Sequence, residues 1–427
     1  MKKILALICT AALLVSASGC NNSNADTNAD ATTSAPTEEA TTTQAPVTEG
    51  EEEDVFTPGG DVTEKMIEIS RLNEGNKARL AKVIKKAQNG EDITVAYIGG
   101  SITQGSSAGN DLCYAKLTSD WIQKQFPDIK VNYVNAGIGA TGSYIGVYRA
   151  DRDVLSKNPD LVFVEFSVND TMENKERNIN SYDSLLRKIW SYETAPAIIC
   201  LGMTQEDGTS FAPHEEIAKS YDLPFISYKN AILHIINDKK FIVWDDISGD
   251  NIHPNVEGHR VLTELITTYI SEAIENVADI SETESDFSKA YTDDKYSSAT
   301  LLTPDNITPT EIVGFTLEDD NFGNFGDYWR MITADGDYKG ATLKFEAEFK
   351  TLGLFYGEIV RRGGTFKVII DGEEKATIDA MFPNGWGNYV EAIEVATYDE
   401  TAKRTVEIVP VNGTSVGQVN ISALAIT

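Results

Sequence analysis

Four short segments of the sequence carry side chains of the kinds that do nucleophilic and acid–base chemistry. Three directly follow apolar runs and one lies farther along the chain: Gly99-Gly100-Ser101-Ile102-Thr103, Asn135-Ala136-Gly137, Ser167-Val168-Asn169-Asp170 and Asp250-Asn251-Ile252-His253-Pro254. A serine hydroxyl is a weak nucleophile at neutral pH, so it needs an imidazole to take its proton and a carboxylate to orient that imidazole. These residue types predict acyl transfer through a serine.

Each candidate fits one role in such a reaction. Ser101 is the expected nucleophile and His253 the expected base, while Asp250, three residues before the histidine, can fix the imidazole tautomer and stabilise its cation. A tetrahedral oxyanion needs preorganised donors. The Ser101 N–H, the Gly137 N–H and the Asn169 side chain are suitable, so we expect them to form the oxyanion hole.

Other readings of the polar residues stay open at this point. Asn169-Asp170 is also a pair that commonly ends a strand in a turn. His259 is expected to be a surface or packing histidine, and His214 and His234 have no motif around them. Because the histidines occur singly, without zinc spacing, we expect neither a metal nor another cofactor.

An alternation of helices and strands must position these segments. Apolar runs at 93–98, 131–134, 161–166, 197–201 and 224–228 are the expected strands. The expected helices cover 77–87, 117–126, 144–155, 182–192 and 229–236, and a longer one runs to about residue 277 with Pro254 in its first turn. Continuous apolar strands separated by helices predict a parallel sheet covered on both faces, with ligands at the carboxyl ends of its strands. We assign this layer to residues 61–280.

The character of the sequence changes after about residue 280. Residues 281–300 are mostly polar and acidic and are the expected linker to a second domain, 301–427. Strands are expected at 342–349, 352–356, 365–370, 375–378 and 405–411, and Asp371-Gly372 predicts a hairpin turn. This spacing favours a β-sandwich of jelly-roll type. Its aromatic residues are candidates either for stacking on sugar rings or for core packing: Trp329, Tyr338, Tyr356, Trp386 and Tyr389.

The first sixty residues differ from the rest. Residues 1–20 combine a short basic start, an apolar run too short for a membrane span of roughly 20 residues, and small residues before Cys20. They resemble a bacterial lipoprotein signal, in which Cys20 is the lipidated residue, although Ala17 stands where such signals usually carry Leu. Plain secretion is the alternative. Residues 21–60 are rich in Thr, Ala and Glu and predict a disordered acidic tether on the cell surface.

Composition excludes several classes of partner. The 427 residues include 36 Lys and Arg against 66 Asp and Glu, a formal net charge of −30 that repels nucleic acid and anionic lipid headgroups. We therefore expect membrane contact only through the N-terminal lipid. Four cysteines are too few for a disulfide scaffold. Cys113 and Cys200 are expected to be free thiols, with a disulfide between them left open.

The four segments together resemble the SGNH, or GDSL-type, hydrolase family over roughly residues 92–275. The resemblance implies a flavodoxin-like three-layer αβα sandwich and assigns Ser101, Asp250 and His253 to the triad and Gly137 and Asn169 to the oxyanion hole. Gly100 stands where the family usually has Asp, and Ser167 where it usually has Gly. The C-terminal domain resembles the jelly-roll modules found beside SGNH esterases of carbohydrate-active type.

These features predict an extracellular serine esterase that removes acetyl or similar short acyl groups from polysaccharides. The loop 105–110 is small and polar, and no long apolar insertion follows it that could line a fatty-acyl groove. An esterase or lipase on small or lipid esters, and a tethered carbohydrate-binding lipoprotein with an inactive hydrolase layer, are the alternatives. The sequence leaves open whether the acyl group passes to water or to a sugar, and the oligomeric state.

Overall fold

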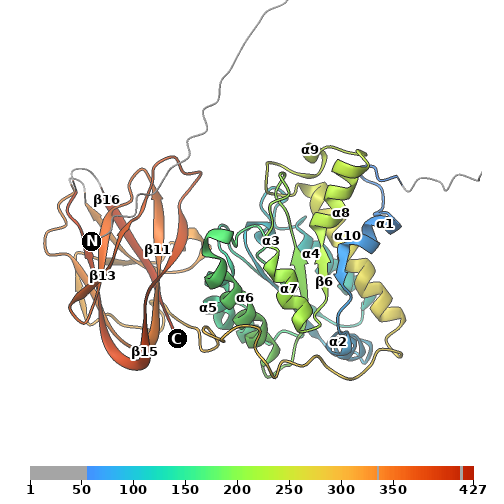
Figure 1. Cartoon of the computed structure of the whole chain (residues 1–427), viewed down its shortest axis with the longest axis horizontal. Helices are drawn as coiled ribbons and strands as arrows, with labels where there is room; N and C mark the ends of the chain where they lie inside the picture. Colours follow the sequence, from blue (N-terminus) through green and yellow to red (C-terminus); the bar gives the residue numbers. More distant parts are fainter. Residues whose placement is uncertain (1–54, 334–335, 414–416) are drawn as a thin grey trace, which may run out of the picture. The chain divides into compact units, whose positions relative to one another are not determined.

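The computed structural model describes residues 55–333, 336–413 and 417–427 (Figure 1). The predicted signal 1–20, the predicted lipidation site Cys20 and most of the predicted tether lie outside these residues. Phe56 belongs to the predicted tether but is fully buried in the core, so the folded part begins before residue 61. No helix within the described ranges is long and apolar enough to cross a membrane.

A six-stranded sheet forms the centre of the first domain, in the order β1-β6-β5-β4-β2-β3. Its strands are β1 (Arg71–Asn73), β2 (Ile93–Gly99), β3 (Val131–Gly137), β4 (Leu161–Glu165), β5 (Ala197–Gly202) and β6 (Phe225–Ser227). Strands β2 to β6 pair in parallel, which confirms the predicted parallel sheet. The edge strand β1 is antiparallel to β6, and the sequence analysis missed it because Arg-Leu-Asn carries no strand signal.

Helices cover both faces of this sheet (Figure 1). The longer ones are α2 (Ala78–Gln88), α4 (Tyr114–Gln125), α5 (Ser143–Asp153), α6 (Lys175–Trp190), α7 (Pro213–Ser220) and α10 (Val256–Glu275). The shorter ones are α1 (Glu64–Ser70), α3 (Ser101–Gln104), α8 (Tyr228–Leu233) and α9 (Trp244–Ile247). Alternate residues of β2 belong to different cores: Tyr97 packs with α2, α4 and α10, and Ile98 with α5, α6 and α7. The three layers follow from this alternation.

The last helix begins later than predicted. Pro254 precedes α10 instead of lying in its first turn. The side chain of Asn255 accepts hydrogen bonds from the N–H groups of Glu257 and Gly258, so it caps the helix and fixes its start after the proline.

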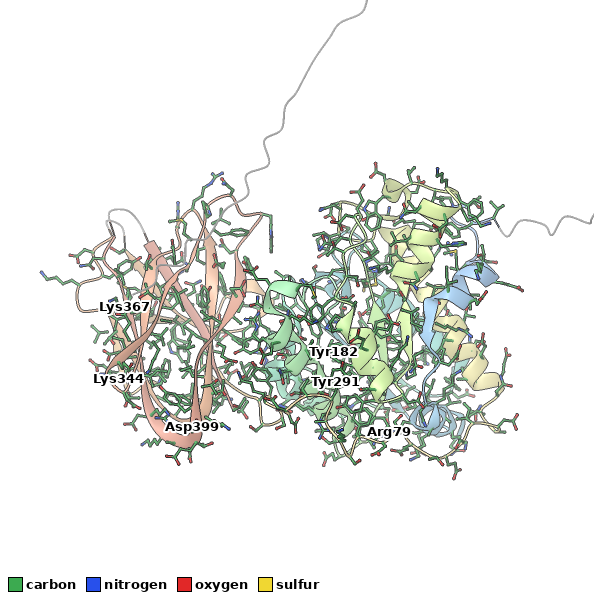
Figure 2. All side chains as sticks on the ribbon, in the orientation of Figure 1. Arg79, Tyr182, Tyr291, Lys344, Lys367 and Asp399 are labelled. Carbon is green, nitrogen blue, oxygen red and sulfur yellow. The ribbon has the colours of Figure 1, made fainter. Side chains whose placement is uncertain are left out.

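The predicted linker is anchored along the first domain. Phe287 stacks on Trp190 and Tyr221, with ring centroids 4.2 and 4.1 Å apart. Arg79 of α2, labelled in Figure 2, pairs with Glu284 at 2.8 Å, and its guanidinium lies over the Trp190 ring. The linker is therefore a fixed strap over the surface of the first domain.

Within the described residues, ten strands form the second domain as one connected sheet, and every pair of these strands except β11 with β14 is antiparallel. The expected β-domain is therefore present, as an antiparallel sheet. Its strands are β7 (Thr300–Leu302), β8 (Glu311–Val313), β9 (Thr316–Glu318), β10 (Tyr328–Thr333), β11 (Thr342–Val360), β12 (Thr365–Ile370), β13 (Glu373–Asp379), β14 (Met381–Phe382), β15 (Tyr389–Pro410) and β16 (Gly417–Ile426). The hairpin at Asp371-Gly372 forms, with positive φ at both residues. The strands predicted at 342–349 and 352–356 are one strand, β11, whose pairing with β15 shifts register between them.

The second half of β11 is buried on both faces. Leu352 and Leu354 point into the core of the β-domain, whereas Phe355 points into the core shared with α5. There Phe355 contacts Tyr144 and Tyr148, with ring centroids 6.2 and 5.9 Å apart. The two domains are therefore joined by an apolar interface.

We expect Phe355→Ala to lower the free energy of unfolding by about 3–5 kcal/mol, because it removes a fully buried ring and leaves a cavity. Chemical denaturation followed by tryptophan fluorescence measures this. Trp386→Ala, at a side chain that is 73% exposed, is the control and should change stability by less than about 0.5 kcal/mol. A loss at Phe355 no larger than the control's would contradict the interface described here.

Glu165, the last residue of β4, is a fully buried acid. Burial raises its pKa to about 7, although Ser167 donates hydrogen bonds to its Oε1 from both its N–H and its hydroxyl. The folded protein therefore holds this proton more tightly than the unfolded chain, whose glutamate pKa is near 4.5.

The stability that this proton contributes should be present below the unfolded pKa of 4.5 and be lost as the pH rises to about 7. We expect Glu165→Gln, which keeps the acceptor oxygen, to remove this part of the pH dependence. Urea denaturation of both proteins between these pH values tests it, and parallel curves of unfolding free energy against pH would rule it out.

Candidate active site

Ser101 is the first residue of α3, and a tight turn at Gly100 joins it to β2. A Cβ atom at Gly99 would overlap Thr103 Oγ1, and one at Gly100 would overlap Asn169 Oδ1. Gly99 has to be glycine, because the Cβ atom would also lie 2.5 Å from the Glu165 carbonyl oxygen. A side chain at position 100, where the resembling family usually has Asp, would displace the side chain of Asn169.

The structure brings the three predicted triad residues together. The Nε2 atom of His253 lies 2.8 Å from Ser101 Oγ, and its Nδ1 atom lies 2.7 Å from Asp250 Oδ2. The other carboxylate oxygen of Asp250 accepts the N–H groups of Ile252 and His253, each at 2.7 Å. Burial alone would raise the pKa of Asp250, but these hydrogen bonds outweigh it and lower the pKa. The carboxylate thus stays charged beside the imidazole.

The Gly137 N–H, predicted to be an oxyanion donor, is directed to another acceptor in this structure. That N–H donates to the side chain of Asn135 at 2.9 Å, and Gly137 is glycine because a Cβ atom there would overlap the backbone of Gln104. The residues of this loop that line the cavity are Gly139 and Ala140, two and three positions later.

Ala140 has a φ of 61°, in the left-handed region, where a residue other than glycine is strained by roughly 1–2 kcal/mol. Its N–H has no backbone acceptor within the described chain. The loop is held on either side, because the Gly139 N–H donates to Gln104 Oε1 at 2.7 Å and Thr141 Oγ1 donates to the Ile138 carbonyl at 2.8 Å. Backbone strain of this kind clusters at functional sites.

Asn169, the other predicted oxyanion donor, does line the cavity. The next residue, Asp170, is buried, and its carboxylate accepts hydrogen bonds from the N–H and hydroxyl of Ser143 at 2.9 and 2.5 Å. His214 Nε2 lies 2.8 Å from the same carboxylate, and its ring stacks on Tyr182. Asp170 and His214 therefore hold Asn169 in place. The sequence gives no sign of this role, because no local motif marks His214.

Both domains line the cavity in front of Ser101. Its volume is about 610 Å³. The first domain supplies the triad and Asn169, and the second supplies Gly323, Asn324, Trp386, Asn388 and Tyr389. Trp386 stacks on Tyr389, with centroids 5.4 Å apart and ring planes at 22°. Of the five aromatic candidates, these two face the cavity, whereas Trp329, Tyr338 and Tyr356 are buried in the β-domain core.

The remaining candidate residues are structural. His259 is fully buried; its Nδ1 accepts the Tyr114 N–H, and burial lowers its pKa to about 4. Cys113 and Cys200 are free and lie in the cores on opposite faces of the sheet. In the described part of the chain, no group of three His, Cys, Asp or Glu side chains is arranged to hold a metal ion.

Comparisons with known proteins agree with this architecture. Residues 97–261 match the GDSL-like Lipase/Acylhydrolase family. An acetylxylan esterase of Geobacillus stearothermophilus is 24% identical over 208 residues, covering 42% of this chain and 92% of that protein. The crystal structure of a two-domain esterase (CEX) active on acetylated mannans is 27% identical, with a TM-score of 0.75, over 84% of this chain and 98% of that one. The structure co-crystallised with mannopentaose gives 28% identity and a TM-score of 0.72 over 84% of this chain and 97% of the other.

The similarity to the two-domain esterase reaches well beyond the catalytic layer, because 84% of this chain exceeds the length of the first domain alone. The first domain is therefore of the GDSL/SGNH esterase type, and, like that two-domain enzyme, the chain carries a second, C-terminal β-sheet domain.

Proposed function

We propose that this esterase removes acetyl groups from a polysaccharide of the mannan or xylan type and passes them to water. One observation carries the proposal: the cavity that holds Ser101 is lined in part by the aromatic pair Trp386 and Tyr389 of the C-terminal domain. An esterase for small esters needs no such aromatic wall. The two-domain relative active on acetylated mannans and the acetylxylan esterase support the substrate class.

The reaction follows from the hydrogen bonds of the site. His253 takes the proton of Ser101 Oγ as that oxygen attacks the acetyl carbonyl, and Asp250 stabilises the imidazolium. The N–H groups of Ser101 and Ala140 and the side-chain amide of Asn169 receive the oxyanion. His253 then gives its proton to the departing sugar oxygen, which leaves an acetyl-enzyme. A water molecule, deprotonated by His253, attacks this ester and releases acetate.

The surroundings of Ser101 favour a short acyl group. Ser106, from the small polar loop predicted to disfavour long chains, lines the cavity beside Gly139 and Ala140. Each methylene of a longer chain contributes about 0.8 kcal/mol only where an apolar groove buries it. We infer that acetyl esters are preferred over octanoyl esters.

The proposal also includes location. The sequence of residues 1–60 favours a lipid anchor at Cys20 and an extended tether, which would present the catalytic domain to polymers outside the cell. Incorporation of labelled palmitate into the wild type, and its loss in Cys20→Ala, tests this part.

We expect Ser101→Ala to lower acetate release from acetylated glucomannan by about 10⁴-fold or more, because no other group can form the acetyl-enzyme. Circular dichroism should show an unchanged fold. Ser191→Ala, at an exposed serine at the end of α6, is the control and should behave as wild type. Near-normal turnover in a folded Ser101→Ala protein would contradict the proposed mechanism.

Trp386→Ala should raise KM for acetylated manno-oligosaccharides roughly three- to tenfold, because it removes the exposed face of the aromatic pair. kcat/KM for nitrophenyl acetate, which lacks a sugar chain, should change little. Trp386→Phe keeps a stacking face and serves as the matched control. Equal KM values for the oligosaccharide in all three proteins would show that Trp386 does not contribute to substrate binding, contrary to the proposal.

A further inference from the structure

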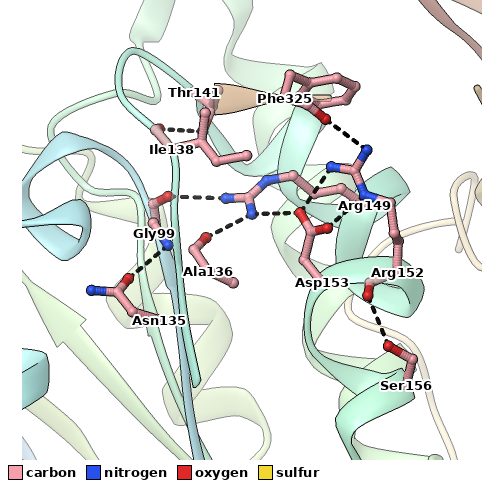
Figure 3. Close-up of polar contacts among 11 residues, drawn as sticks. Gly99, Asn135, Ala136, Ile138, Thr141, Arg149, Arg152, Asp153, Ser156 and Phe325 are labelled. Carbon is pink, nitrogen blue, oxygen red and sulfur yellow. Dashed lines mark hydrogen bonds and ion pairs between the residues drawn. The ribbon is translucent and has the colours of Figure 1, made fainter. Parts of the chain in front are cut away.

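A single buried arginine connects the two loops that carry the reaction. Arg149 of α5 is fully buried. Its Nη1 donates to the Ala136 carbonyl at 2.6 Å and its Nη2 to the Gly99 carbonyl at 3.0 Å (Figure 3). Gly99 ends β2 two residues before Ser101, and Ala136 stands at the end of β3 four residues before Ala140. The guanidinium thus binds the ends of β2 and β3, where the turn that carries Ser101 and the loop that carries Ala140 leave the sheet.

A second contact between these loops lies beside the arginine. The Ile138 N–H donates to the same Gly99 carbonyl at 3.1 Å, and the Ile138 carbonyl accepts the Thr141 hydroxyl at 2.8 Å (Figure 3). A displacement of the Gly99 carbonyl would therefore be transmitted to the segment that contains Ala140. Near-attack geometry is sensitive to shifts of this size, since a 1 Å misplacement can lower a rate by about a hundredfold.

Stability alone gives little reason to bury a cation here. Arg149 pairs with Asp153. Moving two such charges out of water is costly, and replacing a buried ion pair by apolar side chains is often neutral or stabilising. The neighbours of Arg149 on the same helix, Val147 and Ala150, are fully buried apolar residues, so an apolar side chain would suit the surroundings. What an apolar side chain cannot do is donate to two carbonyl oxygens in a fixed fork geometry.

Arg149 is also connected to the C-terminal domain, through an ion pair with Asp153. The Asp153 carboxylate accepts a hydrogen bond from Arg149 at 3.1 Å and two more from Arg152, at 2.5 and 3.1 Å. Arg152 Nη1 donates to the Phe325 carbonyl at 2.9 Å, and its guanidinium lies over the Phe325 ring (Figure 3). Phe325 directly follows Gly323 and Asn324, which line the catalytic cavity.

We propose that Arg149 is a positioning residue for ester hydrolysis, and that Asp153 and Arg152 couple it to the cavity wall formed by residues 323–325 of the C-terminal domain. The inference rests on the proposed function, because the loops it aligns are those that carry Ser101 and Ala140. It gives the C-terminal domain a part in the chemical step as well as in substrate contact.

The test compares four variants of the full chain: Arg149→Met, Arg149→Lys, Arg152→Met and, as the matched control, Arg187→Met. Arg187 of α6 joins the first domain to the linker, donating to the Phe287 carbonyl at 2.8 Å and pairing with Asp294 at 3.3 Å, but it does not line the cavity that holds Ser101. kcat and KM are measured on nitrophenyl acetate and expressed per folded molecule, with the folded fraction taken from circular dichroism.

We expect kcat of Arg149→Met to fall by about a hundredfold with KM nearly unchanged. Arg149→Lys should recover part of this loss, since it keeps one charged donor, and Arg152→Met should give a smaller fall. Arg187→Met should lose stability but keep its kcat. Wild-type kcat in Arg149→Met, with only a lower melting temperature, would overturn the proposal.

If Arg149→Met does not fold, the other two variants decide: wild-type kcat in both Arg149→Lys and Arg152→Met overturns the proposal. Failure of the proposed function gives a different result. In that case the wild type itself hydrolyses no acetyl ester, or Ser101→Ala is as active as the wild type, whatever the arginine variants do.

Discussion

The hydrogen bond between Ser101 Oγ and His253 Nε2 joins residues that are 152 positions apart, and the first domain is organised around holding its two ends. The serine end is fixed by the sheet. Two glycines let the chain turn sharply after β2, and the space above them is filled by Thr103 and Asn169. The histidine end is fixed by a loop whose polar groups bind one another, since Ser248 Oγ lies 2.7 Å from the carbonyls of both Asp250 and His253.

This difference between the two ends explains what could be predicted from the sequence. Asp-x-x-His is a local unit, because Asp250 binds the backbone and the ring of His253 within four residues. It is therefore recognisable without a structure. The oxyanion loop is not local in this sense. The glycine of Asn-Ala-Gly can either let another segment of backbone come close or present its N–H to a ligand. Only the packing of Gly137 against the backbone of Gln104 shows that the first of these roles applies.

The strands were predictable from the sequence where they are buried along their whole length. They were less predictable where contacts with neighbouring strands determine whether a segment forms a strand and where that strand ends. Strands β2, β4 and β5 are buried along their whole length, so their apolar runs could be identified directly. The three residues of β1 have no such pattern and form a strand only because β6 offers a free edge. In the β-domain, the sequence suggested a break near residue 350, but β15 follows β11 across the bulge there and keeps it one strand.

The two-sided burial of β11 also limits how separable the two domains are. Gly353 approaches Tyr144 so closely that a Cβ atom would overlap its hydroxyl oxygen, and Phe355 enters the core beside α5. A protein engineer who transplanted the β-domain onto another catalytic layer would have to supply a matching tyrosine surface. Separating the two domains would expose Phe355 and the tyrosines of α5 to water, so the interface favours their unfolding together.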